Sequence, residues 1–439
     1  MKKNIFMVSV AMLALVSCTK DEVIQINKGQ KIEFRTAVTT RATELTNANL
    51  PSFHVTALYD EVEYFSDVFT KNGACFKSET DYYWPATEEV KFYAYYPYGN
   101  NLPGTVSINA NEKKVTGFTP NTDIAKQVDF VTAFEVYKKD QATNGSVGLD
   151  FEHQLSQIEI KAKNTNSGYT TKIKAIRIKN VAGSGDFDFS AATTNWSNWR
   201  ALTNYEICCP QEEITVEEEV EGEIIQVTKV VDVPLTLTGE AQSLMWNKGN
   251  AMLIPQERPK WGVEEETTTG PVQTAEVDDP QGNGTTSDDG AGNDVDGGDK
   301  TPTTPETEPE ETDPNGFYVA FLVQINTATG IRVFPEITTD EEEKEVDVEY
   351  AWVAQPLAIN WLAGYKYTYE FDFKDGAGVI APDNDPDGPT GPTEPIIPGT
   401  PGEEVYGGKI SVDVSFGGWN TNYSNEDEIY DSSHTVPMD

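Results

Sequence analysis

The chain has 439 residues, of which 72 are acidic and 32 basic, so its formal net charge is −40 and its pI is near 4.3. A protein that binds nucleic acid through a basic patch needs an excess of Lys and Arg to displace counterions from the phosphates. This balance therefore excludes nucleic acid and anionic lipid headgroups as partners. Four segments, residues 211–232, 260–316, 340–349 and 375–405, hold −34 of the charge, so the remaining residues are nearly balanced.

The first residues have the composition of a secretory signal. Two lysines precede an apolar run from Ile5 to Val16, which is shorter than the roughly 20 residues of a transmembrane helix. The run ends in Leu-Val-Ser-Cys, which resembles a bacterial lipobox whose cysteine, here Cys18, is acylated and becomes the new N-terminus. We therefore expect residues 1–17 to be a lipoprotein signal peptide, and Cys18 to anchor the mature chain in the outer membrane. The alternative is a plain signal peptide with an incidental cysteine.

Strand patterns dominate the rest of the chain. Apolar and polar residues alternate with period two within residues 32–38, 90–96, 158–163, 365–373 and 410–416. This alternation is typical of half-buried antiparallel strands, and no long segment shows the 3.6-residue period of a helix. Many short strands separated by turn residues predict an all-β chain built as a sandwich or barrel.

One strand pattern changes phase. Residues 172–179 alternate, but the apolar positions slip between Ile173 and Ile176. An extra residue in a strand produces such a slip, so we predict a β-bulge at this point.

Two long stretches, residues 260–316 and 375–405, have no strand pattern. They are rich in Pro, Gly, Thr and acidic residues. Such segments cannot bury enough apolar surface to offset the entropy lost on ordering. We expect both to be long acidic, disordered or extended insertions in loops of one domain.

The second of these insertions contains a possible calcium loop. Asp383, Asp385 and Asp387 alternate, and Glu394 could close the ligand shell of a hard cation. Three prolines interrupt this spacing and no helix flanks it. We therefore predict no metal site and no cofactor.

Aromatic residues gather in two parts of the chain. Exposed aromatic rings can stack on sugars, but aromatic residues on strands more often fill cores or form cross-strand pairs. Packing is the favoured interpretation, and a glycan-binding platform is the alternative. The residues concerned are Tyr82, Tyr83, Trp84, Tyr93, Tyr95, Tyr96 and Tyr98 in the first group and Trp196 and Trp199 in the second.

The sequence contains no catalytic motif. Gly-x-Ser-x-Gly, His-Glu-x-x-His, a phosphate-binding loop and clustered metal ligands are all missing. Of the three histidines, His153 stands beside Phe151 and Leu155, which indicates a hydrogen-bonded structural role. We therefore expect no catalytic residue and no enzyme.

Three cysteines remain after export, namely Cys75, Cys208 and Cys209. An odd number cannot all pair within one chain, and adjacent cysteines form at best a strained bridge. Unpaired thiols are the favoured interpretation, and a disulfide between Cys75 and either Cys208 or Cys209 is the alternative.

Short blocks of sequence follow one another in a set order along the chain. They are Ile32-Glu33-Phe34 followed by Thr40-Arg41-Ala42, residues 82–85 leading into 92–97, residues 129–133, 151–156, 253–256 and 361–369, and a final strand ending at Trp419. Together with the lipobox, these blocks resemble the fimbrillin-like family of type V pili, which are lipoproteins of anaerobic Gram-negative bacteria. The resemblance covers most of residues 1–420 outside the acidic insertions.

The resemblance implies a domain organisation. Members of this family have two transthyretin-like antiparallel β-sandwich domains, which would here be residues 42–148 and 149–439. The second domain would carry the two disordered insertions. Residues 18–41 would form an N-terminal propeptide that contains the first strand.

The resemblance also implies a mechanism of assembly. In the family, an Arg-specific protease cuts after an arginine at the position of Arg41, here between Arg41 and Ala42, and removes the first strand. The loss leaves an apolar groove and an unpaired edge, which a strand of a neighbouring subunit can fill. Head-to-tail filling does not close on itself, so it produces a filament.

The residues around the predicted cleavage position fit this mechanism. Ile32, Phe34, Thr36 and Val38 form the apolar stripe of the strand that would be exchanged. Residues 39–43 are a polar connection that a protease could reach. The alternative is that Arg41 is an ordinary surface arginine.

We therefore expect a structural or adhesive surface lipoprotein, either a pilus subunit or a tip or accessory component of the fimbrium. Its partners would be other pilin subunits, the outer membrane through the lipid anchor, an Arg-specific protease, and host or bacterial surface ligands. The tail after Trp419 has few apolar anchors, which weakens the case for a stalk subunit that donates a strand. The alternative is a surface lipoprotein that does not polymerise and binds a glycan or a host ligand.

Overall fold

The computed structural model describes residues 26–38, 49–85, 89–142, 146–190, 195–220, 223–262, 312–336, 338–339, 345–346, 348–381, 402–408 and 410–418. Strands predominate throughout these residues, and helical structure there is limited to two 3-10 turns, η1 (Gly99–Asn101) and η2 (Ile124–Lys126). The expectation of an all-β chain is confirmed.

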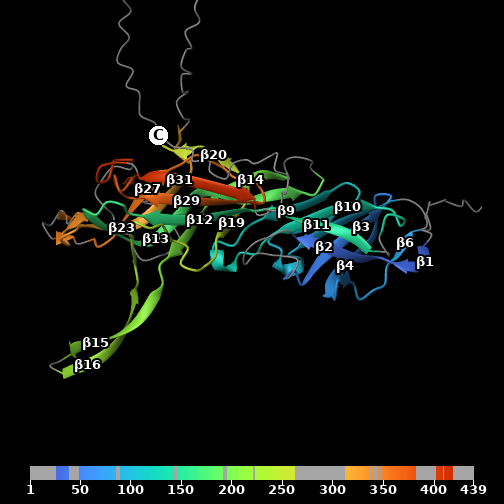
Figure 1. Cartoon of the computed structure of the whole chain (residues 1–439), viewed down its shortest axis with the longest axis horizontal. Helices are drawn as coiled ribbons and strands as arrows, with labels where there is room; N and C mark the ends of the chain where they lie inside the picture. The colour runs from blue at the N-terminus through green and yellow to red at the C-terminus, as the bar shows by residue number, and fades with distance from the viewer. Residues whose placement is uncertain are drawn as a thin grey trace, which may run out of the picture.

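The N-terminal strands close into a barrel, at the right of Figure 1. The family resemblance implied a sandwich here, whereas the strand pattern allowed a sandwich or a barrel, because strands alternate inward and outward in both. A short two-stranded sheet of β1 (Ile26–Lys31) and β6 (Tyr83–Pro85) lies at one end. In barrel order the strands are β10 (Val131–Tyr137), β11 (Ser146–His153), β2 (Glu33–Val38), β5 (Cys75–Lys77), β4 (Val62–Asn72), β3 (Ser52–Tyr59) and β7 (Val90–Tyr96).

The C-terminal part consists of two larger sheets. The first contains β12 (Ser156–Lys163), β18 (Gln242–Ser243), β19 (Ala251–Leu253), β29 (Tyr365–Asp372) and β31 (Ser411–Gly418). The second contains β8 (Thr105–Ile108), β9 (Lys113–Phe118), β13 (Tyr169–Asp188), β14 (Trp196–Cys208), β17 (Leu235–Thr236), β23 (Tyr318–Thr327), β24 (Arg332–Phe334), β27 (Ala351–Pro356) and β30 (Val379–Ile380). Short pairs join β20 (Glu257–Arg258) to β28 (Ile359–Asn360), β21 (Lys260–Trp261) to β22 (Thr312–Asp313), and β25 (Thr338–Thr339) to β26 (Glu345–Val346).

One apolar core fills the space between these two sheets. Ile158 and Ile160 on β12 and Phe371 on β29 contribute from the first sheet, while Ile176 on β13 and Phe321 on β23 contribute from the second. Alternate residues of each strand therefore point into a shared core, as in a β-sandwich. Most strand pairs are antiparallel, but β12 runs parallel to β29, as β2 does to β11.

β13 pairs with strands that come from both halves of the sequence. Its first half pairs with β23, and its last residues pair with β9. The pairing with β23 shifts register between Ile173 and Ala175, which confirms the bulge predicted from the phase slip. The proposed domain boundary between residues 148 and 149 falls within β11, and the division into two domains stays a prediction.

A further apolar cluster joins the barrel to the second sheet. Tyr93 and Tyr95 of β7 enter it from the barrel, while Phe118, Phe187 and Trp196 enter it from β9, β13 and β14. Burial of aromatic side chains is among the larger stabilising contributions in a core. The barrel is therefore packed against the neighbouring sheet rather than connected by chain alone.

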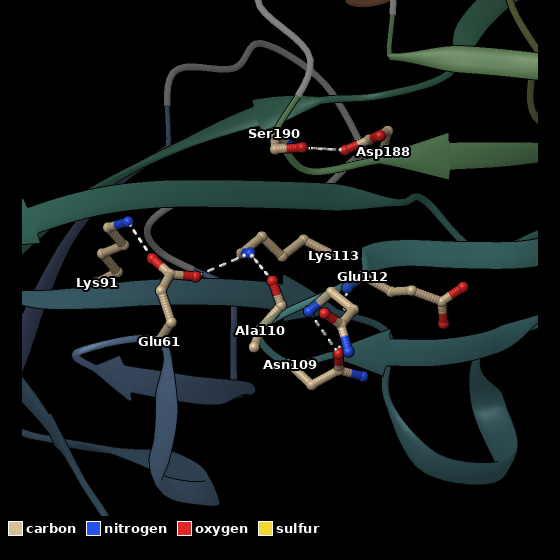
Figure 2. A network of polar contacts seen from close by, with 9 residues as sticks. Glu61, Lys91, Asn109, Ala110, Glu112, Lys113, Asp188 and Ser190 are labelled. Atoms are coloured by element: carbon tan, nitrogen blue, oxygen red, sulfur yellow. Dashed lines mark hydrogen bonds and ion pairs between the residues drawn. The ribbon is translucent and has the colours of Figure 1, made fainter.

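A polar network supports the same junction at the surface. Asp60 and Glu61 form the two-residue turn between β3 and β4, and both have a positive φ. Figure 2 shows the Glu61 carboxylate between Lys91 of β7 and Lys113 of β9, whose Nζ lies 3.0 Å from Oε2. These two ammonium groups, Lys91 first, lower the pKa of Glu61. The carboxylate thus connects a barrel strand to a strand of the second sheet.

Residues at the start of each expected insertion belong to the packed fold. In the insertion placed at 375–405, Ala377 is buried, and a Cβ at Gly378 would lie 2.4 Å from the carbonyl oxygen of Ala354. In the insertion placed at 260–316, Trp261 is buried against the core. The average composition of a segment does not predict that such residues are ordered, because only a few close backbone contacts keep them in place. The interiors of both insertions lie outside the described residues.

The acidic residues 211–232 form a long hairpin of β15 (Gln211–Val220) and β16 (Glu223–Asp232). Figure 1 shows it projecting from the body of the molecule. Ile224 and Val230 on β16 are 71% and 60% exposed. At its base, Lys174 of β13 lies 2.6 Å from the Asp232 carboxylate. The hairpin is therefore attached at its base and exposed along its length.

Replacing residues 213–230 with Asn-Gly should leave the body of the protein intact. A two-residue Asn-Gly turn joins directly opposed residues, and Glu212 faces Val231 in register. We expect the free energy of unfolding to change by less than about 0.5 kcal/mol, as for other exposed changes. Urea denaturation measures this. A variant with Glu217, Glu218 and Glu219 changed to Gln controls for charge, and a much larger loss in the shortened chain alone would show that the hairpin supports the body.

Candidate functional site

β2 completes the wall of the barrel. It runs parallel to β11, from Glu33 opposite Ser146 to Val38 opposite Phe151. On its other side it is antiparallel to β5, where Phe34 lies opposite Phe76. Removing β2 would therefore separate β5 from β11 and open the barrel along one side (Figure 1).

Phe34 is the main apolar contribution of β2 to the barrel core. Its side chain is 0% exposed. The ring meets Phe69, Phe92 and Phe53 edge to face, at centroid separations of 4.6, 5.3 and 6.1 Å. Edge-to-face contacts of this kind add to the stabilisation from burial. Sequence alternation identified Phe34 as inward-facing, but not its three partners, which come from β3, β4 and β7.

The chain entering β2 is held by backbone and apolar contacts. Ile32 is buried, and its N–H donates to the carbonyl oxygen of Tyr82 at 2.8 Å. Burial, together with a hydrogen bond to Asp67, raises the pKa of Tyr82, so the phenol stays protonated and donates to that carboxylate at 3.0 Å. The ion pair of Lys31 with Asp81 is exposed and contributes little. Apolar burial and strand pairing therefore account for most of the attachment.

The residues predicted for strand exchange are only partly brought together. Ile32 and Phe34 are buried in the same core, and Thr36 is half-buried opposite Leu149. Val38 is placed by its backbone register opposite Phe151.

The positions predicted for lipidation and cleavage cannot be placed in the fold. Cys18, Arg41 and Ala42 lie outside the described residues, so all three stay predictions.

Among the aromatic residues considered as a glycan platform, most belong to cores. Trp84, Tyr93 and Tyr95 are buried, as is Trp196, whose Nε1 donates to the carbonyl oxygen of Gln154 at 2.7 Å. These rings are unavailable to a ligand. Trp199 differs, because 48% of its surface is exposed.

His153 is paired with a carboxylate that sequence reasoning missed. Its Nδ1 lies 2.8 Å from Oδ2 of Asp129, and the two side chains are 1% and 4% exposed. Asp129 precedes β10 and His153 ends β11, so the pair joins two neighbouring barrel strands. This burial fits the structural role expected for His153. No sequence signal singled out Asp129 as the partner.

The described cysteines, Cys75, Cys208 and Cys209, are free thiols. The described residues contain no group of three or more His, Cys, Asp and Glu side chains able to hold a metal ion, while the possible calcium loop of residues 383–394 lies outside them. No helix in the described ranges has the length and apolar character needed to cross a membrane.

Comparisons with known proteins identify similar chains. The sequence profile of a family described as fimbrillin-like matches residues 19–384. No curated protein matches significantly. Among solved structures, a protein proposed to act in cell adhesion from Parabacteroides distasonis is 9% identical, with a TM-score of 0.42 over 89% of this chain and 97% of that one.

Two further solved structures are similar to lesser degrees. A protein from Bacteroides ovatus, also proposed to act in cell adhesion, is 15% identical, with a TM-score of 0.34 over 79% of this chain and 94% of that one. The fimbrial anchor protein Mfa2 from Porphyromonas gingivalis is 9% identical, with a TM-score of 0.25 over 49% of this chain and 76% of that one.

Proposed function

The chain belongs to the fimbrillin-like family, and from this membership we propose that it is a subunit or accessory component of a fimbrium that assembles by protease-triggered exchange of β2. The observation that carries the proposal is Phe34, a fully buried residue on a barrel strand that ends shortly before Arg41. Because β2 precedes Arg41, a cut there would release this strand without unthreading the rest of the barrel. Its departure would expose the rings of Phe53, Phe69 and Phe92.

Cleavage removes the concentration advantage that β2 has over strands of other molecules while it is covalently attached. While residues 39–48 connect β2 to the chain that follows, β2 is present at its own groove at an effective concentration on the order of millimolar or higher. A strand from another molecule cannot compete with it. After a cut at Arg41, β2 is a separate peptide, and an incoming strand with the same alternation can replace it against β11.

Lipidation at Cys18 would couple this step to location. Cys18 precedes Arg41 in the sequence, so a cut at Arg41 separates the acylated segment from the barrel. The uncleaved chain would be held at the outer membrane, and the cleaved body would be free to join a neighbour at the cell surface. The same order of residues would keep assembly from starting before export.

Digestion of the purified chain with an Arg-specific protease should release a segment that ends at Arg41 and convert monomers into ladders or filaments. Loss of β2 leaves an apolar groove and an open strand edge, which other copies or pilin subunits can fill. Mass spectrometry identifies the released segment, and denaturing gels and electron microscopy detect assembly.

Two arginine variants and one peptide sharpen this experiment. Arg41→Ala should stay monomeric after protease treatment, whereas Arg35→Ala should behave as the unchanged chain, because Arg35 lies within the paired strand β2. A synthetic peptide of residues 26–38, added in excess, should reoccupy the groove and suppress assembly. Filaments from Arg41→Ala, or a cleaved chain that stays monomeric with pilin subunits present, would refute strand exchange.

A further inference from the structure

A second surface feature lies on β14, a strand of the second sheet, whereas β2 belongs to the barrel (Figure 1). Asn198 and Ala201 on this strand have φ values of +51° and +46°. Residues other than Gly rarely adopt this left-handed conformation. Ala also lacks the short polar side chain whose local hydrogen bonds make the conformation more tolerable for Asn or Asp. The two residues enclose Trp199 and Arg200. The backbone is therefore strained on both sides of an exposed aromatic residue and a cation, an arrangement that accumulates at functional sites.

Asp186 holds this irregular segment in place. Its Oδ2 accepts hydrogen bonds from Nη2 of Arg200 at 2.6 Å and from Nδ2 of Asn198 at 3.0 Å. Its Oδ1 accepts one from the backbone N–H of Gly117 at 2.8 Å. The pairing of β13 with β14 shifts register between Ser184 and Asp186. A bulge fixed by a nearly buried carboxylate re-aims the side chains that follow it.

Trp199 is directed into an open cavity of about 320 Å³. Its Nε1 donates to the carbonyl oxygen of Pro255 at 3.0 Å, which fixes the ring, yet 48% of the side chain is exposed. Leu202 on the same strand also lines the cavity and is exposed. The cavity thus offers a rigid indole surface of the size that suits a small ligand.

The far wall of the cavity is polar and equally fixed. Gln256 is buried, with Oε1 accepting from the N–H of Ala182 at 2.7 Å and Nε2 donating to the carbonyl oxygen of Ile254 at 2.9 Å. Arg258 donates from Nη2 to the carbonyl oxygen of Asn315 at 2.7 Å, while its Nε is buried without a partner among the described residues. These hydrogen bonds hold the wall rigid.

The charges that line the cavity cancel. Arg200 is paired with Asp186, which neutralises it, and residues of both charge signs, Glu257 and Arg258, line the cavity. An anionic ligand would meet Glu257, and a cationic one would meet Arg258. Donors and acceptors around an apolar ring surface instead suit a molecule that carries hydroxyl groups and no net charge.

We propose that this cavity, formed by β14 and β20, binds one pyranose residue of a neutral glycan. The C–H groups on one face of the sugar ring stack on the indole of Trp199. The hydroxyl groups of the sugar then point outward from the edge of its ring. The hydroxyl groups accept from Arg258 and donate to Glu257. This site is separate from β2, so adhesion to a glycan does not depend on strand exchange.

A glycan array carrying neutral and acidic oligosaccharides tests the proposal on the full uncleaved chain, followed by saturation-transfer NMR with the methyl pyranosides that match. We expect binding of a neutral glycan, weakened about tenfold or more by Trp199→Ala, since loss of a stacking surface removes most of the apolar contact. Glu257→Gln should weaken it less. Phe416→Ala, which truncates an exposed aromatic residue on β31, should leave binding unchanged.

Several results would overturn the assignment. These are no binding to any neutral glycan, binding confined to acidic sugars, or equal affinity in the Trp199→Ala chain. Circular dichroism shows whether each variant is folded. Protease-triggered assembly of Trp199→Ala should proceed as in the unchanged chain, so a failure of glycan binding and a failure of strand exchange are distinguishable.

Discussion

Replacing Phe34 with Ala in the uncleaved chain is expected to lower the free energy of unfolding of the barrel by about 3–5 kcal/mol, the range for truncating a buried Phe. The cavity would lie among Phe53, Phe69 and Phe92, whose rings are each fixed by further aromatic neighbours and cannot collapse into it. Urea denaturation followed by far-ultraviolet circular dichroism measures the loss. Hydrogen exchange of β11, which pairs with β2, locates it.

The same truncation at an exposed Phe serves as a control, because it shows how much of the loss comes from burial of the ring. Phe134→Ala removes an aromatic ring from β10 that is 45% exposed, so it should cost less than about 1 kcal/mol. The Phe34→Ala chain should also accept a synthetic peptide of residues 26–38 without any cleavage, because its own strand now binds its groove more weakly. Equal stabilities for the two variants would mean that β2 is not an integral part of the barrel.

The alternation of apolar and polar residues was enough to identify β2 but not its neighbours. Period two places Ile32, Phe34 and Thr36 on one face, and the structure buries the first two. The pattern does not reveal that β2 is parallel to β11, because the two strands are more than a hundred residues apart. Barrel closure depends on such distant pairings, and these are decided by complementary packing rather than by local preference.

Trp196 and Trp199 illustrate the same limit at the level of a single site. They are three residues apart, so alternation already predicts that they face opposite sides of the strand. Which ring is buried depends on Asp186 and on the left-handed residues Asn198 and Ala201. Nothing in the local sequence demands a positive φ at an alanine. Tertiary contacts impose it, and only the folded chain reveals the cavity.

Substituting Asp129 with Ala is expected to destabilise the junction of β10 and β11 by about 1–3 kcal/mol, because a buried imidazole loses the carboxylate that it faces. The imidazole of His153, 1% exposed, would lose the carboxylate 2.8 Å away and could not reach water. The loss should exceed that from His153→Ala in a chain that already lacks Asp129, because the pair acts as a unit. Equilibrium denaturation of the single and double variants gives the coupling.

Replacing both Asp129 and His153 with apolar residues tests whether the pair contributes to stability or to strand register. Asp129→Leu combined with His153→Phe removes two buried polar groups at once, and replacement of this kind is often neutral for stability. If the double variant recovers most of the loss of Asp129→Ala, the pair does not stabilise the barrel beyond what an apolar core would. Its role would then be to fix register, since His153 lies opposite Val131 where β10 and β11 meet. A double variant as unstable as Asp129→Ala would instead show that the polar contact itself stabilises β11, the strand that pairs with β2.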